Sequence, residues 1–458
     1  MEHRIREKWL YNLSNLHRRL FYLLLILIPT QLGYHVWPDF AFVNGIRVDY
    51  LAPTVYLTDL IILGIATTWL AQKIRNSNTE IRNKLEISNS KYKILILGLL
   101  FFILNILFSF IPQLALLKLF TLVKLAFLTF YIVKTRPDFK ISVGCLLVAA
   151  CWSSAIAWIQ IINQSSIGGL MWFLGERTFS VGTPGIATAI IHDKLILRPY
   201  GTFPHPNVLA GFLVVLFPLV LNTLSSVSKK ITVPLSVFLL LTLVITFSRS
   251  AWIVAGILLI VMLMSNQHYV KIHKSPSGIG MALTILIIGL LPILSERFLN
   301  LSSVDMQSIT RRMDLNYAAM EMVTDYPLFG VGLNNFLVTL PHYLKINSYQ
   351  DIQPAHNIYL LLVAEWGIVG FALIMFLIYK FFTRIHSIQY EILLPISALL
   401  FLGLFDHYPY TIHQMQLLFA VLIGCAISLS SNHRHHETDK KNSQGSPARR
   451  ASRRRIRT

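Results

Sequence analysis

The chain has 458 residues, of which 54% are hydrophobic and only 13% are charged. This composition excludes a water-soluble globular protein, because so few charged residues cannot cover so many apolar ones. The formal net charge of +19 would suit a nucleic-acid-binding protein, but the distribution of Lys and Arg along the chain argues against that class.

Apolar runs of roughly 17–22 residues recur along the chain, and a helix of that length crosses the hydrocarbon core of a bilayer, about 30 Å thick. The sequence therefore predicts an all-α, polytopic integral membrane protein with about twelve transmembrane helices. The expected spans are 21–38, 53–72, 94–111, 115–133, 141–162, 205–221, 232–247, 251–265, 278–295, 356–379, 391–404 and 413–430. The first run follows a basic leader without a small-residue cleavage site, which indicates an uncleaved anchor.

Lys and Arg concentrate in alternate connecting segments. These segments are 1–20, 73–93, 134–140, 222–231, 266–276, 380–390 and 431–458. This positive-inside pattern places both termini in the cytoplasm and predicts a multi-pass protein of the cytoplasmic membrane. We expect a cytoplasmic N-terminus at 1–20, one membrane domain at 21–430, and a basic, disordered cytoplasmic tail at 431–458 that contacts anionic lipid, not nucleic acid.

Few chemically active residues lie within the apolar runs. Cys145, Cys151 and Cys425 have no disulfide or metal-ligand spacing and are interpreted as small hydrophobic residues. Two lysines fall in the fourth run. Lys118 is placed to snorkel outward, whereas Lys124 is deeper and is expected either to pair within the bundle or to line a polar cavity.

Two long connections, 163–204 and 296–355, are expected on the outside, where binding and catalysis tend to lie. The first ends in "ILRPYGTFPHPNVLAGF", which contains Arg198 and also His205 between two prolines. A His in that position is more readily explained as part of a rigid turn.

The second connection contains "RRMDLNYAAMEMV", whose spacing predicts an amphipathic helix at the membrane surface that ends before Pro327. Arg311 and Arg312 open this helix, as solvated residues or as anion ligands. The following "GVGLNN" predicts a glycine-rich turn and is too short for a dinucleotide-binding motif.

Two further residues are candidates for function at the outer surface. Arg249 stands between two apolar runs, either as a helix-end residue that snorkels to the interface or as a ligand for an anion. His356 follows Pro354 in the expected first turn of a helix, where the helix dipole favours the neutral imidazole. It could cap the helix or accept a proton.

Four motifs together resemble the O-antigen ligase and polymerase superfamily of bacterial envelope enzymes. They are "TFSRSAW", the R-x-x-L-x-x-A-A spacing that begins at Arg312, "DYPLFGVGLNNF" and "AHNIYLLLVAEWG". "YGTFPHPNVLAGF" fits the same group, so the resemblance covers about residues 195–375. Asn316 departs from the family, which often has an aromatic residue there.

The resemblance implies a fold akin to other polytopic membrane glycosyltransferases and a reaction outside the cytoplasmic membrane. A glycan would move from undecaprenyl diphosphate to an acceptor hydroxyl with inversion, without a metal or other cofactor. The acceptor would be lipid A-core in a ligase, a second lipid-linked glycan in a polymerase, or a protein in an O-glycosylating transferase. His356 would be the catalytic residue, with Arg249 and Arg312 on the diphosphate. Arg311, Arg198 and His205 complete the expected substrate-binding set.

The main alternative from another class is a secondary transporter, or a flippase for lipid-linked glycans. Twelve helices with both termini inside would suit either. A flippase should line a central cavity with charges from several helices, and here only Lys124 clearly qualifies. The polar residues concentrate instead in the two outside connections, which favours an enzyme.

Overall fold

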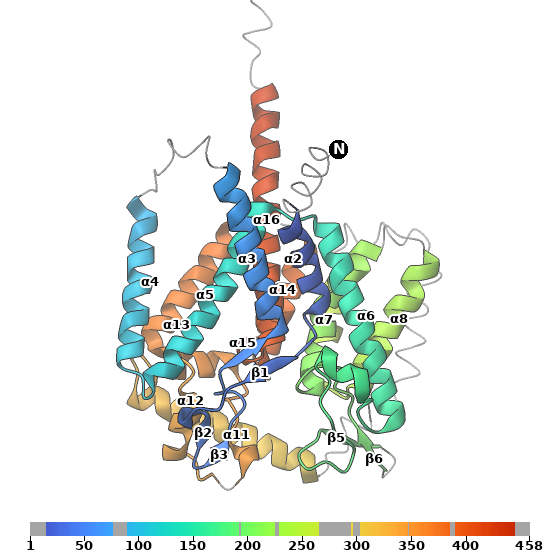
Figure 1. Cartoon of the computed structure of the whole chain (residues 1–458), viewed down its shortest axis with the longest axis vertical. Helices are drawn as coiled ribbons and strands as arrows, with labels where there is room; N and C mark the ends of the chain where they lie inside the picture. The colour runs from blue at the N-terminus through green and yellow to red at the C-terminus, as the bar shows by residue number, and fades with distance from the viewer. Residues whose placement is uncertain are drawn as a thin grey trace, which may run out of the picture.

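The computed structural model describes residues 15–76, 89–191, 194–224, 229–264, 295, 303–346, 348–384 and 390–444. The protein is mainly a bundle of apolar helices, with shorter elements gathered at one end (Figure 1). The helices of the bundle are α2 (Leu16–Leu27), α3 (Leu57–Asn76), α4 (Asn89–Leu107), α5 (Pro112–Thr135), α6 (Phe139–Asn163), α7 (Pro206–Leu224), α8 (Lys229–Ile245), α9 (Arg249–Met264), α13 (Ile358–Arg384), α14 (Tyr390–Leu402) and α16 (His413–Gln444).

Five of the described helices are long and apolar enough to cross a membrane. They contain the segments Leu57–Arg75, Pro112–Thr135, Phe139–Asn163, Ile358–Thr383 and His413–Ser430. Shorter apolar helical segments occur at Ile96–Leu107, Pro206–Val220, Pro234–Ile245, Arg249–Met262 and Ile392–Leu402. A multi-pass, helical membrane protein is therefore confirmed, whereas the count of twelve spans is not. Of the span expected at 278–295, residues 278–294 lie outside the described residues.

The first expected span, 21–38, has the wrong boundaries. Helix α2 ends at Leu27, just before Pro29, and the chain then forms strand β1 (Gly33–His35). Pro29 lacks the backbone N–H that would make the next helical hydrogen bond, which favours the end of the helix here. At the other end of the chain, α16 continues to Gln444, so residues 431–444 of the expected disordered tail are helical.

In the part of the chain that the structure describes, three two-stranded antiparallel sheets lie between the helices, all at the same end of the bundle (Figure 1). Strand β1 pairs with β4 (Thr54–Tyr56), β2 (Phe42–Val43) with β3 (Ile46–Arg47), and β5 (Thr188–Ile191) with β6 (Lys194–Leu197). These strands are too short to carry a readable alternation of polar and apolar residues, which is why the sequence predicted only helices.

The connection between α9 and α13 contains the amphipathic helix that the sequence predicted. Helix α11 (Ser303–Asp325) includes all of 311–323 and ends before Pro327, as expected. It crosses the end of the bundle that carries the short strands (Figure 1). Leu315, Ala318 and Met322 are buried on one face, and Met313 and Tyr317 are exposed on the other.

The glycine-rich turn after α11 packs against a kink in α13, so two of the sequence motifs form one structural unit. Val331 N donates to Ala364 O at 2.9 Å, and Ile368 N donates to Pro327 O at 2.8 Å. Gly367 makes this possible at φ +66°, because a Cβ there would lie 2.2 Å from Leu328 O. The unit fixes the position of α11 relative to the start of α13.

The polar residues of α5 are paired inside the bundle. Lys124 Nζ lies 2.6 Å from Asp59 Oδ1, so of the two expectations for Lys124, pairing within the bundle is confirmed. Lys118 does not snorkel outward, because its side chain is buried and Nζ donates to Tyr410 O at 3.1 Å. Cys145, Cys151 and Cys425 are free.

Candidate active site

The candidate site lies where α14 ends and α13 begins. Ile358 N donates to Gly403 O at 2.8 Å, and a Cβ on Gly403 would lie 2.3 Å from Ile358 Cδ1. A glycine therefore lets the start of α13 approach the end of α14 closely. The segment after Gly403 leads to Asp406, His407 and the short helix α15 (Tyr408–Thr411). His356, two residues before α13, is brought against this segment.

His356, Asp406 and His407 form a buried cluster whose polar atoms lie within 4.8 Å of one another. The two imidazole rings are edge to face, with centroids 5.1 Å apart. His407 Nε2 lies 3.9 Å from Asp406 Oδ1, and its Nδ1 lies 2.7 Å from Thr411 Oγ1. In contrast, Nδ1 of His356 is buried with no hydrogen-bond partner among the described residues. Leaving a buried polar atom unpaired costs roughly 1–3 kcal/mol, so this nitrogen has the capacity to hydrogen-bond to a molecule bound in the site.

Asp406 connects this cluster to two arginines. Its Oδ2 lies 4.0 Å from Arg312 Nη2, and it accepts the side-chain amide of Asn207 at 3.1 Å. Arg198 Nη2 donates to Asn207 Oδ1 at 2.6 Å, and its Nε donates to Thr246 O at 2.8 Å. The network therefore joins the connection before α7, the turn between α8 and α9, helix α11 and the segment between α14 and α15.

The charges in the site are set by burial and by these neighbours. Burial lowers the pKa of His356 well below its usual value, and Arg312 adds to the effect, whereas Asp406 opposes it. Burial likewise lowers the pKa of His407 to about 4. Burial alone would raise the pKa of Asp406, but His356, His407 and Arg312 hold it below its usual range. At neutral pH the site therefore contains a carboxylate, a guanidinium and neutral imidazoles.

The other expected site residues are placed as follows. Arg249 is the first residue of α9, half-buried and three residues beyond Thr246, so Arg249 and Arg198 flank the same turn. His205 shapes the turn before α7, where Nδ1 accepts the backbone N–H of Asn207 at 3.1 Å. Burial, then Arg198, lowers the pKa of His205 to about 3.

Arg311 points to a different set of partners from Arg312. Its Nε lies 3.4 Å from Asp351 Oδ1, and Nη2 donates to Gln350 Oε1 at 3.1 Å. Both partners belong to the 3₁₀-helix η6 (Tyr349–Asp351). This pairing ties α11 to the segment that leads into α13.

The sequence analysis missed Asp406, His407, Asn207 and Tyr50. Tyr50 lies edge to face on His407, with ring centroids 5.5 Å apart. Asn207 lies within the quoted motif "YGTFPHPNVLAGF", and the signal for Asp406 and His407 was "FDHYPY", an acidic residue and a histidine directly after an apolar run.

The same three side chains could in principle hold a metal ion, since two imidazoles and a carboxylate are common ligands. However, Arg312 Nη2 is 4.0 Å from the carboxylate that would bind the ion. A fixed positive charge at that distance weakens the attraction of the carboxylate for a divalent cation.

The comparisons with known proteins agree with the motif-based resemblance. Residues 234–375 match the family model described as O-antigen ligase. This match confirms the resemblance to the O-antigen ligase superfamily, and the matched segment contains Arg249, Arg312 and His356. No curated protein matches the chain. Asp406 lies outside the matched segment and is brought to it only by the fold.

Proposed function

We propose that this protein, which carries an O-antigen ligase domain, transfers a glycan from undecaprenyl diphosphate to an acceptor hydroxyl. The reaction would take place on the outer face of the cytoplasmic membrane. The observation that carries the proposal is the neutral, buried His356 beside the Arg312–Asp406 pair, within a helical membrane protein. A proton acceptor next to a cation is what transfer from a diphosphate requires.

His356 is proposed to be the general base. The acceptor hydroxyl gives its proton to an imidazole nitrogen of His356 while its oxygen forms a bond to the anomeric carbon. The bond between that carbon and the diphosphate oxygen breaks, and the diphosphate keeps the electron pair. Attack opposite the leaving group inverts the anomeric configuration. A neutral imidazole suits this role, because only the unprotonated form accepts a proton.

Asp406 is proposed to position His356 and Arg312. As a buried carboxylate it stabilises the imidazolium that forms during the reaction, which a neutral residue would do less well. It also holds one side of the Arg312 guanidinium, whose side chain is still 34% exposed. The exposed part can pair with phosphate oxygens as a planar, permanently charged donor.

The leaving diphosphate is proposed to be neutralised by arginines instead of a divalent metal. Arg312 is the best supported of them, and Arg249 at the start of α9 is the second. Arg198 is held by Asn207 and Thr246 and is proposed to shape the turn before Arg249 as well as to add positive charge. Preorganised cations on a leaving group typically lower a barrier by several kcal/mol.

The outward orientation of the site is supported by the charges at the two ends of the bundle. At the end opposite α11, the described termini of α2, α3, α5 and α6 carry seven basic residues: Arg18, Arg19, Lys73, Arg75, Lys134, Arg136 and Lys140. The acidic residue in these described termini is Asp138, so basic residues are in clear excess there. An excess of Lys and Arg marks the cytoplasmic side of a membrane protein, which supports the proposed outer location of the candidate site.

Transfer by purified protein, with a lipid-linked glycan as donor, tests the proposal directly. Release of lipid diphosphate together with a glycosylated acceptor is expected. Ligase, polymerase and protein O-glycosylating transferase share this donor step, and the species that accumulates in a deletion strain separates them. Lipid-linked long polymer indicates a ligase, lipid-linked single repeats a polymerase, and unglycosylated protein an O-glycosylating enzyme. Movement of intact lipid-linked glycan across a vesicle membrane, with no transfer, would instead indicate a flippase.

A further inference from the structure

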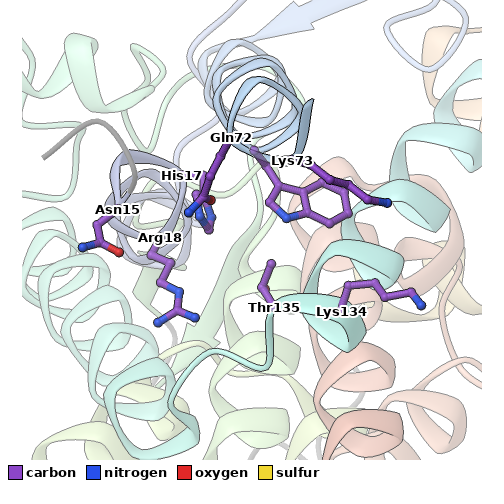
Figure 2. A pocket seen from close by; sticks show the side chains of 8 residues that line it. Asn15, His17, Arg18, Gln72, Lys73, Lys134 and Thr135 are labelled. Carbon is purple, nitrogen blue, oxygen red and sulfur yellow. The ribbon is translucent and has the colours of Figure 1, made fainter. Parts of the chain in front are cut away.

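A cavity of about 390 Å³ opens at the end of the bundle opposite the candidate active site, between the ends of three helices. It is lined by the first turn of α2 and the last turns of α3 and α5 (Figure 2). The other end of α5 lies beside Asn335, near α11, and a 24-residue helix is about 36 Å long. The cavity is therefore a separate site from the His356 cluster.

The lining of the cavity is strongly basic. Each of the three helices contributes one cation: Arg18 from α2, Lys73 from α3 and Lys134 from α5. Lys73 and Lys134 extend to the same side of the cavity, and Arg18 lies across from them (Figure 2). The described lining residues also include Asn15 and Gln72 as hydrogen-bond donors, and none of them is acidic. Such a lining attracts a compact anion with several acceptor oxygens.

The inner wall of the cavity is fixed by packed aromatic residues. His17 is buried, and its Nδ1 lies 2.7 Å from the Tyr131 hydroxyl. Trp69 packs edge to face on Tyr131, with ring centroids 5.5 Å apart, and Lys73 Nζ lies 5.8 Å from the Trp69 ring. The inner wall of the cavity is thus formed in advance of binding, which lowers the entropy lost when a ligand is bound against it.

The surface next to the cavity is apolar and exposed on the bundle. Phe130 is 46% exposed beside Trp69, and Leu70 and Ile74 on α3 are 47% and 70% exposed. Lys134 Nζ lies 5.6 Å from the Phe130 ring, so charge and apolar surface adjoin. A free anion would gain nothing from this apolar surface, whereas acyl chains would cover it.

The geometry points to a binding site for an anionic phospholipid, with its phosphate head group in the Arg18–Lys73–Lys134 cavity and its acyl chains along α3 and α5. Basic pockets between membrane helices at the cytoplasmic surface commonly take such head groups. The lipid would brace α2, α3 and α5 against one another at this end of the bundle. This site does not depend on the proposed transfer reaction.

Native mass spectrometry of the full-length protein, titrated with phosphatidylglycerol or phosphatidylcholine, tests this site. The combined Arg18→Gln, Lys73→Gln and Lys134→Gln variant should bind phosphatidylglycerol on the order of a hundredfold more weakly, at about fivefold per charge. The matched control is Arg19→Gln, Arg75→Gln and Lys140→Gln, three exposed residues outside the lining. It removes the same charge and should change the affinity by less than about fivefold.

A second variant, Gln72→Trp, fills the cavity without changing its charge and should also weaken binding. Equal losses of phosphatidylglycerol affinity in the cavity and control triple variants would mean that general surface charge causes the effect. That result would overturn the proposal. Equal affinity of the wild type for the two lipids would also overturn it. Displacement of the lipid by millimolar inorganic phosphate would show a free-phosphate site instead. If the triple variant does not fold, Lys134→Gln alone should still lower the affinity about fivefold.

Discussion

Arg312 Nη2 lies 4.0 Å from Asp406 Oδ2, and Arg312 Nη1 donates to the neighbouring Phe405 O at 3.3 Å. The two contacts attach α11 to the segment between α14 and α15. They orient the Arg312 guanidinium. The Asp406 carboxylate is buried, whereas the Arg312 side chain remains partly exposed. An arginine held in this way loses little conformational freedom when it binds an anion, so this pair is the structural basis of the proposed diphosphate site.

Arg311 and Arg312 are adjacent on α11 but have different partners, and they form a matched pair for mutation. Arg312→Lys should weaken donor binding and turnover, on the order of tenfold or more, because an ammonium keeps the charge but loses the planar fork. Arg311→Lys keeps a cation near Asp351 and should retain most of the activity. Donor titrations and initial rates of both variants provide the measurement. Equal losses in the two variants would contradict the assignment of Arg312 to the diphosphate.

Arg249 should behave like Arg312. Arg249→Lys is expected to weaken donor binding as well as turnover, again because the ammonium cannot make two parallel hydrogen bonds to a phosphate. The same donor titration measures it, with Arg47→Lys as the control, because Arg47 is an exposed residue paired with Asp49. Unchanged donor affinity in Arg249→Lys would leave Arg249 as a residue that snorkels to the interface.

His356→Ala should abolish transfer while leaving donor binding largely intact, because the arginines hold the diphosphate. Removing a general base typically slows a reaction by about a hundred- to ten-thousand-fold. His342→Ala is the control, since His342 is exposed and lies on the short 3₁₀-helix η5 (Leu340–His342). Thermal melting of both variants in detergent should match the parent. Transfer at a near-parental rate in His356→Ala would remove His356 from the mechanism and make His205 the next candidate.

The helical bundle and the places of Arg312 and His356 in it were predictable from the sequence. Residues 311–323 carry a helical period strong enough to place Arg312 on α11, and the long apolar run after Pro354 places His356 at the start of α13. Asp406 was not predictable, because it lies in a short connection without any period. Its role follows only from the contacts at Gly403, Asn207 and Arg312.

The glycine motifs were also incomplete when taken alone. "GVGLNN" predicted a glycine-rich turn and "AHNIYLLLVAEWG" supported the family resemblance, but neither predicted that Gly330 and Gly367 allow one backbone to pack on the other. Each motif is explained only by its partner, which lies more than thirty residues away in the sequence. Local patterns do not carry such pairings.

The orientation of the bundle can be tested by cysteine labelling in intact cells, after the three native cysteines are replaced by alanine. Thr178→Cys, in the 163–204 connection, should react with a membrane-impermeant maleimide. Lys140→Cys, at the opposite end, should react only after the cells are lysed. Both positions are exposed, so accessibility within the protein does not separate them. The reverse pattern would place the His356 cluster in the cytoplasm and contradict transfer on the outer face.

Activity is expected to be independent of divalent metals, because arginines instead of a metal ion neutralise the leaving diphosphate. Purified protein with lipid-linked donor and acceptor should keep its rate in excess chelator. Loss of transfer in chelator, with recovery on adding magnesium or manganese, would count against the arginine-based mechanism. It would also make His356, Asp406 and His407 the first candidate ligands.

Asp406→Asn separates positioning from catalysis by its effect on the pH profile. Burial lowers the pKa of His356, so the wild-type enzyme has a neutral base and kcat should be nearly flat between about pH 6 and about pH 8. The Asp406 carboxylate raises the pKa of His356 against that trend. Its replacement by a neutral amide should therefore lower that pKa further and move the acid limb of the profile to lower pH. The base also becomes weaker and the imidazolium loses its counter-charge, so kcat should fall by on the order of tenfold to a hundredfold on the pH-independent plateau. Loss of the Arg312 contact should raise KM for the donor as well.

Asp314→Asn, an exposed change on α11, is the control and should leave both constants unchanged. A lower kcat in Asp406→Asn with an acid limb at the parental pH would mean that Asp406 acts only through the packing of the segment between α14 and α15.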